Sequence, residues 1–366
     1  MTAPVTAGSE GRAGTTEPLD TLGMFEAAAS MPEQIVEATE RARGLENLPE
    51  RDQVEHVVVL GMGGSGIAGE VLQAAAGPYL PVPVLNFRSY NVPAFVDESS
   101  LVFAVSFSGD TEETVEAVTE AALQGARVVV ITTGGELGHR AESWDAPIVR
   151  VQPGIPTPRA GLGALSIPPL VILEEIGLFP GASHWIDLAV EQLSSRRDRL
   201  TESGNEAEEL ARRIGRTIPL IYGSGGIGTV AAHRWKNQVN ENAKVPAFSN
   251  SLPELCHNEV CGWGQHGDLT RQVMTVVNLR HDFEHPQIGE RYRLVNEVLD
   301  EVVARIEEVR AEGEGELAQL LDLMMFGDFT SLYMAFQEGI DPGPVPVLDH
   351  IKFALAGTRP EGADPE

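Results

Sequence analysis

The sequence predicts an α/β protein in which two doubly wound parallel-sheet subdomains pack together with flanking helices. Short apolar runs rich in β-branched residues alternate with segments of helical periodicity, which is typical of parallel sheets covered by helices. A strand, a glycine turn and a helix start occur twice, in VVVLGMGGSGIA (57–68) and PLIYGSGGIGTVA (219–231), and this weak internal repeat indicates two subdomains of one type. The length of 366 residues suits two domains of that size.

The first half of the chain predicts a parallel sheet. Residues 22–45 have the spacing of apolar residues that is typical of helices. Two helical pieces are expected, because Pro32 is suited to the first turn of the second piece. A strand, a turn and a helix start follow at 54–68, and the later apolar runs are short enough to be buried strands. These further strands are expected at 82–87, 101–105, 127–132 and 148–151, and a helix is expected at 111–124.

The second half repeats this alternation after a crossing segment at 153–169, which is rich in Pro and Gly. Apolar residues at helical spacing predict helices there, and short apolar runs predict strands. Strands are expected at 218–222 and 273–279, and helices at 170–176, 185–213, 229–239, 290–311, 315–338 and in a final short segment containing Lys352.

The charge of the chain excludes some classes of partner. The formal net charge of −28 argues against nucleic acid and anionic membranes, and no apolar run is long enough to span a bilayer. The first residues, MTAPVTAGSEGRAGTTEP, lack the basic and apolar regions of a signal peptide, so we expect a disordered tail and a cytoplasmic location. An anionic ligand would need local positive potential from helix N-termini and chosen Arg or Lys side chains. Lysine occurs at only three positions, Lys236, Lys244 and Lys352.

The cysteine content predicts neither disulfides nor a metal site. Cys256 and Cys261 are the only cysteines, which fits a reducing compartment. Together with His257 they could ligate a metal, but their spacing fits no common zinc pattern and no second Cys/His cluster completes a tetrahedron. We therefore expect no metal and no cofactor.

A phosphate monoester site is predicted in the stretch LVFAVSFSGDTEETVEAV (101–118). The apolar run is typical of a buried strand, and Thr111 with the acidic residues after it supplies the N-cap and first turn of a helix. The turn between them directs backbone N–H groups, the helix dipole and the hydroxyls of Ser106, Ser108 and Thr111 toward one spot. A serine-rich capped turn without a ligand is the alternative.

The first glycine turn, at 61–66, has two interpretations. It matches the dinucleotide fingerprint G-x-G-x-x-G between a strand and a helix. NAD would require an acidic residue at the end of the next strand, where the chain has NFR (86–88), whereas Arg88 could meet the 2′-phosphate of NADP. A structural role, in which the glycines allow a close approach of helix and strand, is favoured for the second turn at 223–228.

The other interpretation of the first turn uses more residues. Gly64 and Ser65 would form one side of a phosphate cradle whose other side is 106–111. Both loops would follow adjacent strands of one parallel sheet, and such sheets bind ligands at the carboxyl ends of their strands.

Six motifs that follow one another along the chain support the second interpretation. On these motifs, the chain resembles the sugar isomerase (SIS) domain family, and specifically the bifunctional phosphoglucose/phosphomannose isomerases. The first two motifs are shared by all sugar isomerase domains, and the last four are more specific. They are GMGGSGIAGE (61–70), SFSGDTEET (106–114), PTPRAGLG (156–163), NQVNENAKVPAF (237–248), ELCHNEVCGW (254–263) and PVPVLDHIK (344–352).

The resemblance implies two flavodoxin-like, SIS-type subdomains, a homodimer with its active site at the interface, and metal-free interconversion of aldose and ketose 6-phosphates. It implies that Arg159 steadies the enediolate and that Glu241 is the base. It also implies that His257, supplied by the partner subunit, opens the sugar ring together with Lys352. The residues that would hold the phosphate are Gly64, Ser65, Ser106, Ser108 and Thr111.

The expected activity is interconversion of glucose 6-phosphate and/or mannose 6-phosphate with fructose 6-phosphate. Three alternatives remain open: a non-catalytic phosphosugar-binding sensor, an NADP-binding oxidoreductase and a zinc-dependent sugar-phosphate isomerase. The joint presence of Glu241, His257 and Lys352 disfavours the sensor. The predicted organisation is a disordered tail at 1–18, a first subdomain with the phosphate-binding loops at 19–180, a second with the catalytic residues and C-terminal helix at 181–357, and a disordered tail at 358–366.

Overall fold

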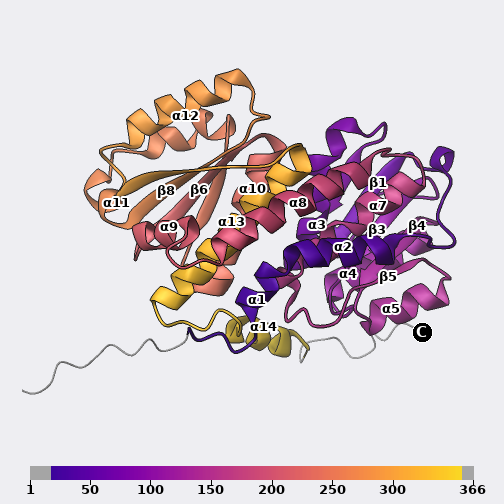
Figure 1. Cartoon of the computed structure of the whole chain (residues 1–366). Coiled ribbons are helices and arrows are strands. Elements are labelled where there is room, and N and C mark those ends of the chain that lie inside the picture. The colour runs from indigo at the N-terminus through magenta and orange to yellow at the C-terminus, as the bar shows by residue number, and fades with distance from the viewer. Residues whose placement is uncertain (1–17, 357–366) are drawn as a thin grey trace, which may run out of the picture.

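The computed structural model describes residues 18–356 of the chain (Figure 1). It contains two parallel sheets, one of five strands and one of four, so the predicted two-sheet α/β class is confirmed. The tails expected at 1–18 and 358–366 lie outside the described residues, apart from Pro18. Within the described range, no helix combines the length and the apolar character needed to cross a membrane.

The first sheet has the strand order β2-β1-β3-β4-β5, and all its pairings are parallel. Its alternate side chains pack on opposite faces. Val58 and Val102 cluster with α4 (Glu112–Leu123) and α5 (Gly135–Ser143), whereas Val57 clusters with α2 (Met31–Ala42) and α3 (Gly63–Ala75). The strands are β1 (His56–Gly61), β2 (Val84–Phe87), β3 (Ser100–Val105), β4 (Arg127–Thr132) and β5 (Ile148–Arg150).

The second sheet repeats this plan with the order β7-β6-β8-β9, again all parallel. On one face, Tyr222 and Val276 pack against Tyr292 of α12 (Pro286–Leu299). The other face, with Ile221 and Val277, joins the same core as α10 (Gly225–Gln238). The strands are β6 (Ile218–Ser224), β7 (Phe248–Leu252), β8 (Met274–Arg280) and β9 (Arg305–Arg310).

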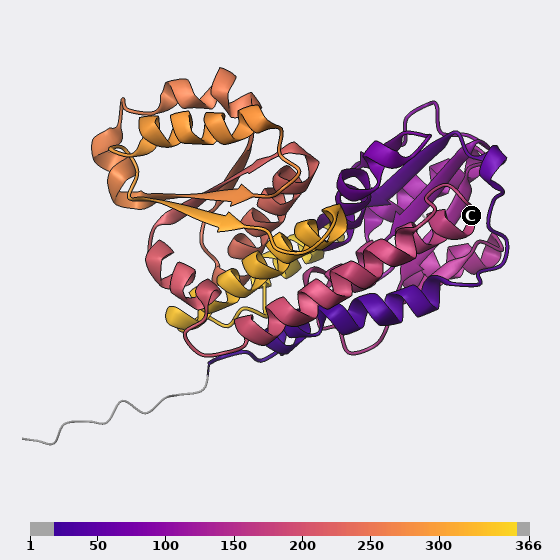
Figure 2. The same ribbon diagram turned by 45° about the horizontal axis from the view of Figure 1, so that its top comes forward.

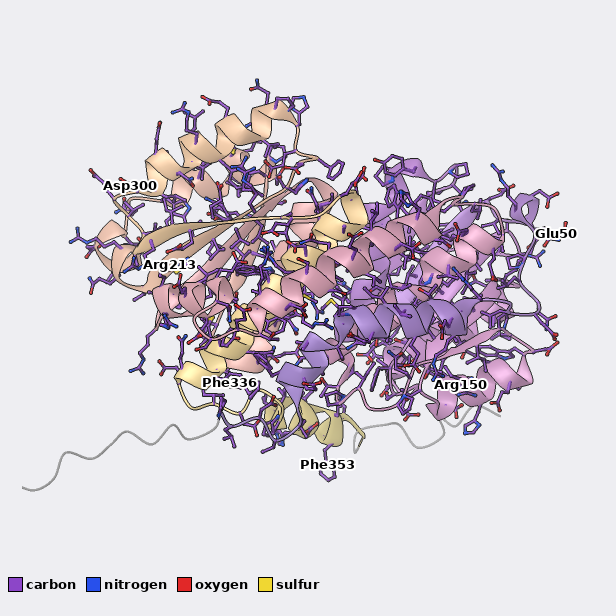
Figure 3. All side chains as sticks on the ribbon, in the orientation of Figure 1. Glu50, Arg150, Arg213, Asp300, Phe336 and Phe353 are labelled. Atoms are coloured by element: carbon purple, nitrogen blue, oxygen red, sulfur yellow. The ribbon has the colours of Figure 1, made fainter. Side chains whose placement is uncertain are left out.

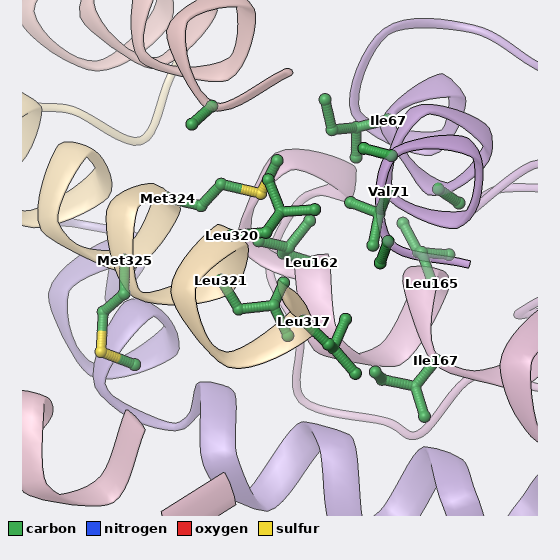
Figure 4. Close-up of a cluster of buried hydrophobic side chains, with 14 of the residues drawn as sticks. Ile67, Val71, Leu162, Leu165, Ile167, Leu317, Leu320, Leu321, Met324 and Met325 are labelled. Carbon is green, nitrogen blue, oxygen red and sulfur yellow. The ribbon is translucent and has the colours of Figure 1, made fainter. Parts of the chain in front are cut away.

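Helix α13 (Glu316–Gln337) runs between the two subdomains (Figures 1 and 2). It packs against α8 (Ala182–Leu200), α9 (Glu206–Ile214) and α10, and it also touches α3. Figure 4 shows Leu317 and Leu320 of α13 in one cluster with Val71 of α3 and Leu165 of α6 (Leu162–Ser166). Every residue of α13 from Leu317 to Leu332 is buried, so this helix is covered on all sides. One hydrophobic core therefore serves both sheets.

Two predictions for the second half are wrong, and two strands were not predicted. Residues 185–213 are not one helix, because Gly204 takes a φ of 74° and Asn205 caps a new helix by accepting two backbone N–H groups. Residues 290–311 are not one helix either, because α12 ends at Leu299 and β9 follows it. The strands β7 and β9 were not predicted.

The remaining elements connect these units. The helix in two pieces predicted at 22–45 is confirmed as α1 (Met24–Ala29) and α2, with Pro32 in the first turn of α2. The other helices are α7 (Pro168–Glu175), α11 (Gly267–Val273) and α14 (Pro346–Ala356). The shorter turns are η1 (Arg51–Gln53), η2 (Gly77–Tyr79), η3 (Pro158–Ala160), η4 (Val239–Ala243), η5 (Glu254–His257) and η6 (Glu259–Gly262).

Asp322 is a buried carboxylate on α13 whose protonation is linked to folding. It accepts hydrogen bonds from Gln192 Nε2 and from the backbone N–H of Glu312, both at 2.9 Å, and lies 3.2 Å from Nε of the buried Arg196. Burial nevertheless raises the pKa of Asp322 to about 6, because Arg196 and the hydrogen bonds offset only part of the desolvation. Between pH ~4 and about 6, the folded state therefore keeps a proton on Asp322 that the unfolded state has already lost.

This linkage predicts the sign of a pH effect on stability. Since the folded pKa is the higher one, the contribution of Asp322 is most favourable below pH ~4, decreases as the pH rises toward about 6, and changes in total by about 3 kcal/mol. We expect the free energy of unfolding of the wild type, relative to Asp322→Asn, to decrease by that amount across this interval. Urea unfolding of both proteins at matched pH values measures it. A difference that is constant with pH would contradict the linkage.

Candidate active site

The candidate site lies at the carboxyl ends of β1 and β3, where the strand order of the first sheet reverses. Open parallel sheets bind ligands at such a point. The two strands pair directly, with Gly61 opposite Val105, so the loops that follow them are neighbours. The backbone N–H of Phe107 donates to Ser65 Oγ at 3.1 Å, which joins the loops. The predicted phosphate cradle is therefore one continuous surface.

The hydroxyls of the second loop are arranged by hydrogen bonds within the loop. The buried Ser106 Oγ accepts from the Gly109 N–H at 3.1 Å and donates to Thr111 Oγ1 at 3.0 Å. Thr111 occupies the N-cap position of α4 but makes no side-chain cap bond, so its hydroxyl faces the loop. Ser108 is exposed and accepts from the Asp110 N–H at 3.2 Å. The N-termini of α3 and α4 thus flank a set of hydroxyls suited to an anion.

Arg159 reaches the same place from the segment after the first sheet. It lies in η3, and a Cβ on Gly64 would be 2.7 Å from its backbone nitrogen, which explains the need for glycine in the first loop. Its buried guanidinium donates to Asn242 Oδ1 at 2.9 Å and to the carbonyl oxygens of Pro342 and Gly343 at 2.8 and 2.7 Å. Burial lowers the pKa of Arg159, and the charge of Glu241 opposes this shift.

Glu241 lies beside Arg159, with Oε2 at 3.6 Å from Arg159 Nη1. It belongs to η4, a π-helical turn that directly follows α10. Such turns are rare in proteins as a whole, but many of those that occur lie at functional sites. About a quarter of the side chain is accessible, 28%, so the carboxylate can reach a ligand in the cradle while the guanidinium is covered. The structure therefore brings the predicted base, the predicted arginine and the phosphate loops together.

A buried ion pair lies beneath these groups. Arg234 of α10 donates to both carboxylate oxygens of Asp328 on α13, at 2.9 and 2.6 Å, and also to the backbone carbonyl of Arg159 at 2.9 Å. Asn242 Nδ2 donates to Ser331 Oγ of α13 at 2.9 Å. Helix α13 thereby fixes both Arg159 and the turn that contains Glu241.

Lys244 is a site residue that sequence reasoning missed. Its side chain donates to the backbone carbonyls of Glu241 and Pro342, and its own φ of 59° ends the π-helical turn. Burial and the charge of Arg159 lower the pKa of Lys244. The signal was available, because Lys244 is one of only three lysines and lies in the motif at 237–248.

His257 and Lys352 do not join this cluster within one chain. His257 is exposed in η5, and the carboxylates beside it have other partners: Glu254 accepts from Asn258 Nδ2 at 2.7 Å, and Glu259 accepts from Asn250 Nδ2 at 2.6 Å. Lys352 is exposed on α14, and Figure 3 shows Phe353 of that helix pointing away from the fold. In the described part of the chain, no hydrogen bond or ion pair links either residue to Arg159 or Glu241.

Arg88, which the dinucleotide interpretation assigned to a 2′-phosphate, is engaged within the fold. Its Nη2 lies 2.6 Å from Glu70 Oε1 and donates to the carbonyl of Gly66 at 3.2 Å. A guanidinium already neutralised by a carboxylate is a poor receptor for a further anion, which disfavours NADP. At the second glycine turn, a Cβ on Gly223 would lie 1.9 Å from the carbonyl oxygen of Gly228, as a close-packing role for that turn requires.

Comparison with known proteins decides the family. A model described as the bacterial phospho-glucose isomerase C-terminal SIS domain matches residues 203–355, and a SIS domain model matches 52–137. A bifunctional phosphoglucose/phosphomannose isomerase of Caldicellulosiruptor bescii is 34% identical over 91% of this chain and 99% of its own length. The chain belongs to the bifunctional phosphoglucose/phosphomannose isomerase family. A further member of that family, from Aquifex aeolicus, is 32% identical over 82% of this chain and 90% of its own length.

Solved structures agree with the fold of this phosphoglucose/phosphomannose isomerase family member. The C-terminal domain of glucosamine-fructose-6-phosphate aminotransferase from Francisella tularensis is similar with a TM-score of 0.68 and 16% identity, over 88% of this chain and 98% of that one. Tagatose-6-phosphate ketose/aldose isomerase from Escherichia coli is similar with a TM-score of 0.63 and 16% identity, over 90% and 98%. The resemblance that the motifs indicated is therefore confirmed, and so is the SIS-type architecture.

Proposed function

We propose that this protein is an aldose–ketose isomerase that interconverts glucose 6-phosphate and/or mannose 6-phosphate with fructose 6-phosphate. The reaction proceeds by ring opening and proton transfer through a cis-enediol(ate). The observation that carries the proposal is the partly exposed Glu241 carboxylate 3.6 Å from the buried Arg159 guanidinium, beside the two hydrogen-bonded loops that we propose hold the phosphate. Family membership supports the same reaction class.

The proposed chemistry assigns one task to each group. Gly64, Ser65, Ser106, Ser108 and Thr111 hold the phosphate through backbone N–H groups and hydroxyls. Glu241 removes a proton from one of the adjacent carbons C1 and C2 and returns it to the other, which one carboxylate on a fixed turn can do. Arg159 stabilises the negative charge of the enediolate, since it is held in place before substrate binds.

Ring opening is assigned to His257 and Lys352, with His257 supplied by the partner subunit of a homodimer. Support comes from the position of His257: it is exposed, and the carboxylates flanking it are already occupied. We also propose the division into subdomains at 19–180 and 181–357, which the family matches at 52–137 and 203–355 support. A cytoplasmic location is proposed because charged sugar phosphates stay in the compartment in which they are made.

The test is formation of fructose 6-phosphate from glucose 6-phosphate and from mannose 6-phosphate, in parallel and with a chelator present. Turnover of both substrates is the expected result, and turnover of one would narrow the substrate while keeping the mechanism. Loss of activity in the chelator would favour a zinc-dependent isomerase. Phosphosugar binding without turnover of either substrate would refute the proposal and favour a sensor. An absorbance or fluorescence titration with NADP tests the oxidoreductase, and no change in the signal would exclude it.

A further inference from the structure

A row of polar side chains that the proposed mechanism does not use connects α3 with α10. Its centre is Glu70 of α3, whose side chain is only 16% exposed. The two Glu70 oxygens lie 3.0 and 2.9 Å from Nδ1 of His233 on α10, and Oε1 lies 2.6 Å from Nη2 of Arg88. This carboxylate therefore joins a helix that packs on the first sheet, α3, to a helix that packs on the second sheet, α10.

The hydrogen bonds of the row define the tautomer of His233. Nδ1 faces a carboxylate, which only accepts, so Nδ1 carries a proton and donates it to Glu70. In the neutral imidazole Nε2 is then an acceptor, and the Nδ2 group of Asn237 lies 3.3 Å from it as the donor. Asn237 Oδ1 in turn accepts from Lys236 Nζ at 3.2 Å. Every polar atom between Arg88 and Lys236 thus has a matching partner.

The row connects two helices that each lead to a part of the candidate active site. At one end, Arg88 Nη2 donates to the carbonyl of Gly66, in the first turn of the helix that begins with the phosphate loop. A Cβ on Gly66 would lie 2.9 Å from Arg88 Nε, so the contact is close. At the other end, Asn237 precedes Glu241 by four residues, about one helical turn or ~6 Å of axial rise.

The two helices are also in close contact at a second point. A Cβ on Gly226 of α10 would lie 3.2 Å from the Cα of Ala74 on α3. A small rotation of α10 about this contact would move its C-terminal end, and with it Glu241, relative to the phosphate loop. Glu70 and His233 form a hydrogen-bonded contact between α3 and α10 that opposes such a rotation.

We propose that Glu70 and His233 are positioning residues that set α10 against α3, so that Glu241 is held at its working distance from a sugar whose phosphate is bound by the first loop. The inference rests on the proposed isomerase function. It deepens that function by assigning the alignment between the phosphate site and the base to a hydrogen-bonded contact between the two subdomains. Neither residue touches the substrate, and both act through the placement of Glu241.

The test compares steady-state kinetics of Glu70→Gln, His233→Ala and His233→Asn. We expect Glu70→Gln and His233→Ala to lower kcat about tenfold while KM changes less than about twofold, since misplacing a base by a fraction of an ångström affects the transition state more than phosphate binding. His233→Asn should recover most of kcat, because its amide Nδ2 takes the place of Nδ1 and can donate to Glu70. Stabilisation by inorganic phosphate, measured as a rise in Tm, should be equal in all variants.

The matched control is Glu290→Gln, which removes an exposed glutamate paired with Arg293 on α12 and should leave both constants unchanged. Two results would overturn the inference: an unaltered kcat in Glu70→Gln, or a rise in KM at constant kcat. Equal kcat values for His233→Asn and His233→Ala would also count against it. A wild-type protein without turnover would instead refute the proposed function, and the inference with it.

Discussion

Glu241→Gln is expected to lower kcat for hexose 6-phosphate isomerisation by about 10²- to 10⁴-fold, the usual contribution of a general base. The amide is nearly isosteric and can remain beside Arg159, but it cannot accept a proton from carbon. KM and phosphosugar binding should change little, because the phosphate contacts belong to other elements. Initial rates from glucose 6-phosphate and mannose 6-phosphate, together with calorimetric binding of the same sugars, measure both quantities.

The control for this variant is Glu297→Gln, which removes an exposed glutamate of α12 and should have wild-type rates. Near-normal turnover in Glu241→Gln would exclude the residue as the base. The same variant tests the homodimer: mixed with His257→Ala, it should recover about a quarter of wild-type activity, because half of the dimers are mixed and each mixed dimer has one intact site. No recovery in refolded mixtures would contradict a partner-supplied His257.

Asp328→Asn is expected to lower the free energy of unfolding by about 3–5 kcal/mol, the usual cost of removing one partner from a buried ion pair. Asp328 is buried and accepts two hydrogen bonds from Arg234 and one from Gln238 at 2.9 Å. Burial raises the pKa of Asp328 and the nearby Arg234 charge opposes the shift, so the pair depends on both members. Denaturant unfolding at pH 7 measures the loss.

A surface pair provides the comparison for this variant. Glu37→Gln breaks the exposed pair of Glu37 with Arg41 on α2 and should change the free energy of unfolding by less than about 0.5 kcal/mol. Because Arg234 also donates to the backbone of Arg159, Asp328→Asn should lower kcat even where the variant is fully folded. Equal stability of the two variants would show that the buried pair is not required.

The strands that were predicted well from the sequence are those whose burial follows from a short run of apolar residues. β1, β3 and β4 are short β-branched runs buried almost throughout, and the predicted bounds of β3 and β4 differ from the observed ones by at most one residue. β7 and β9 escaped prediction because neither has a continuous apolar run. The β7 sequence FSNSL is polar and partly exposed, and RIEEVR of β9 alternates so weakly that it continued the helical pattern of α12. Their pairing is a tertiary effect that no local pattern contains.

The site shows the same division. Ser106 and Ser108 follow one strand and precede one helix, so their convergence follows from local sequence. Ser65 joins them only through the pairing of β1 with β3. Arg159 and Glu241 come from distant segments, and only the motif resemblance brought them together before the fold was known. Arg234 and Asp328 carry no local signal that distinguishes them from solvated charges, because their roles depend on packing across α10 and α13.

The course of α13 limits how this protein can move. Its side chains interdigitate with helices of both subdomains, and Asp328 and Ser331 hold the groups beside Arg159 and Glu241. Hinge bending between the sheets would require close-packed side chains to slide past one another, which protein interiors resist. The two halves of the site therefore form a rigid body, and any segment that moves to admit a sugar must lie at its rim. The base and the arginine are aligned before the substrate arrives.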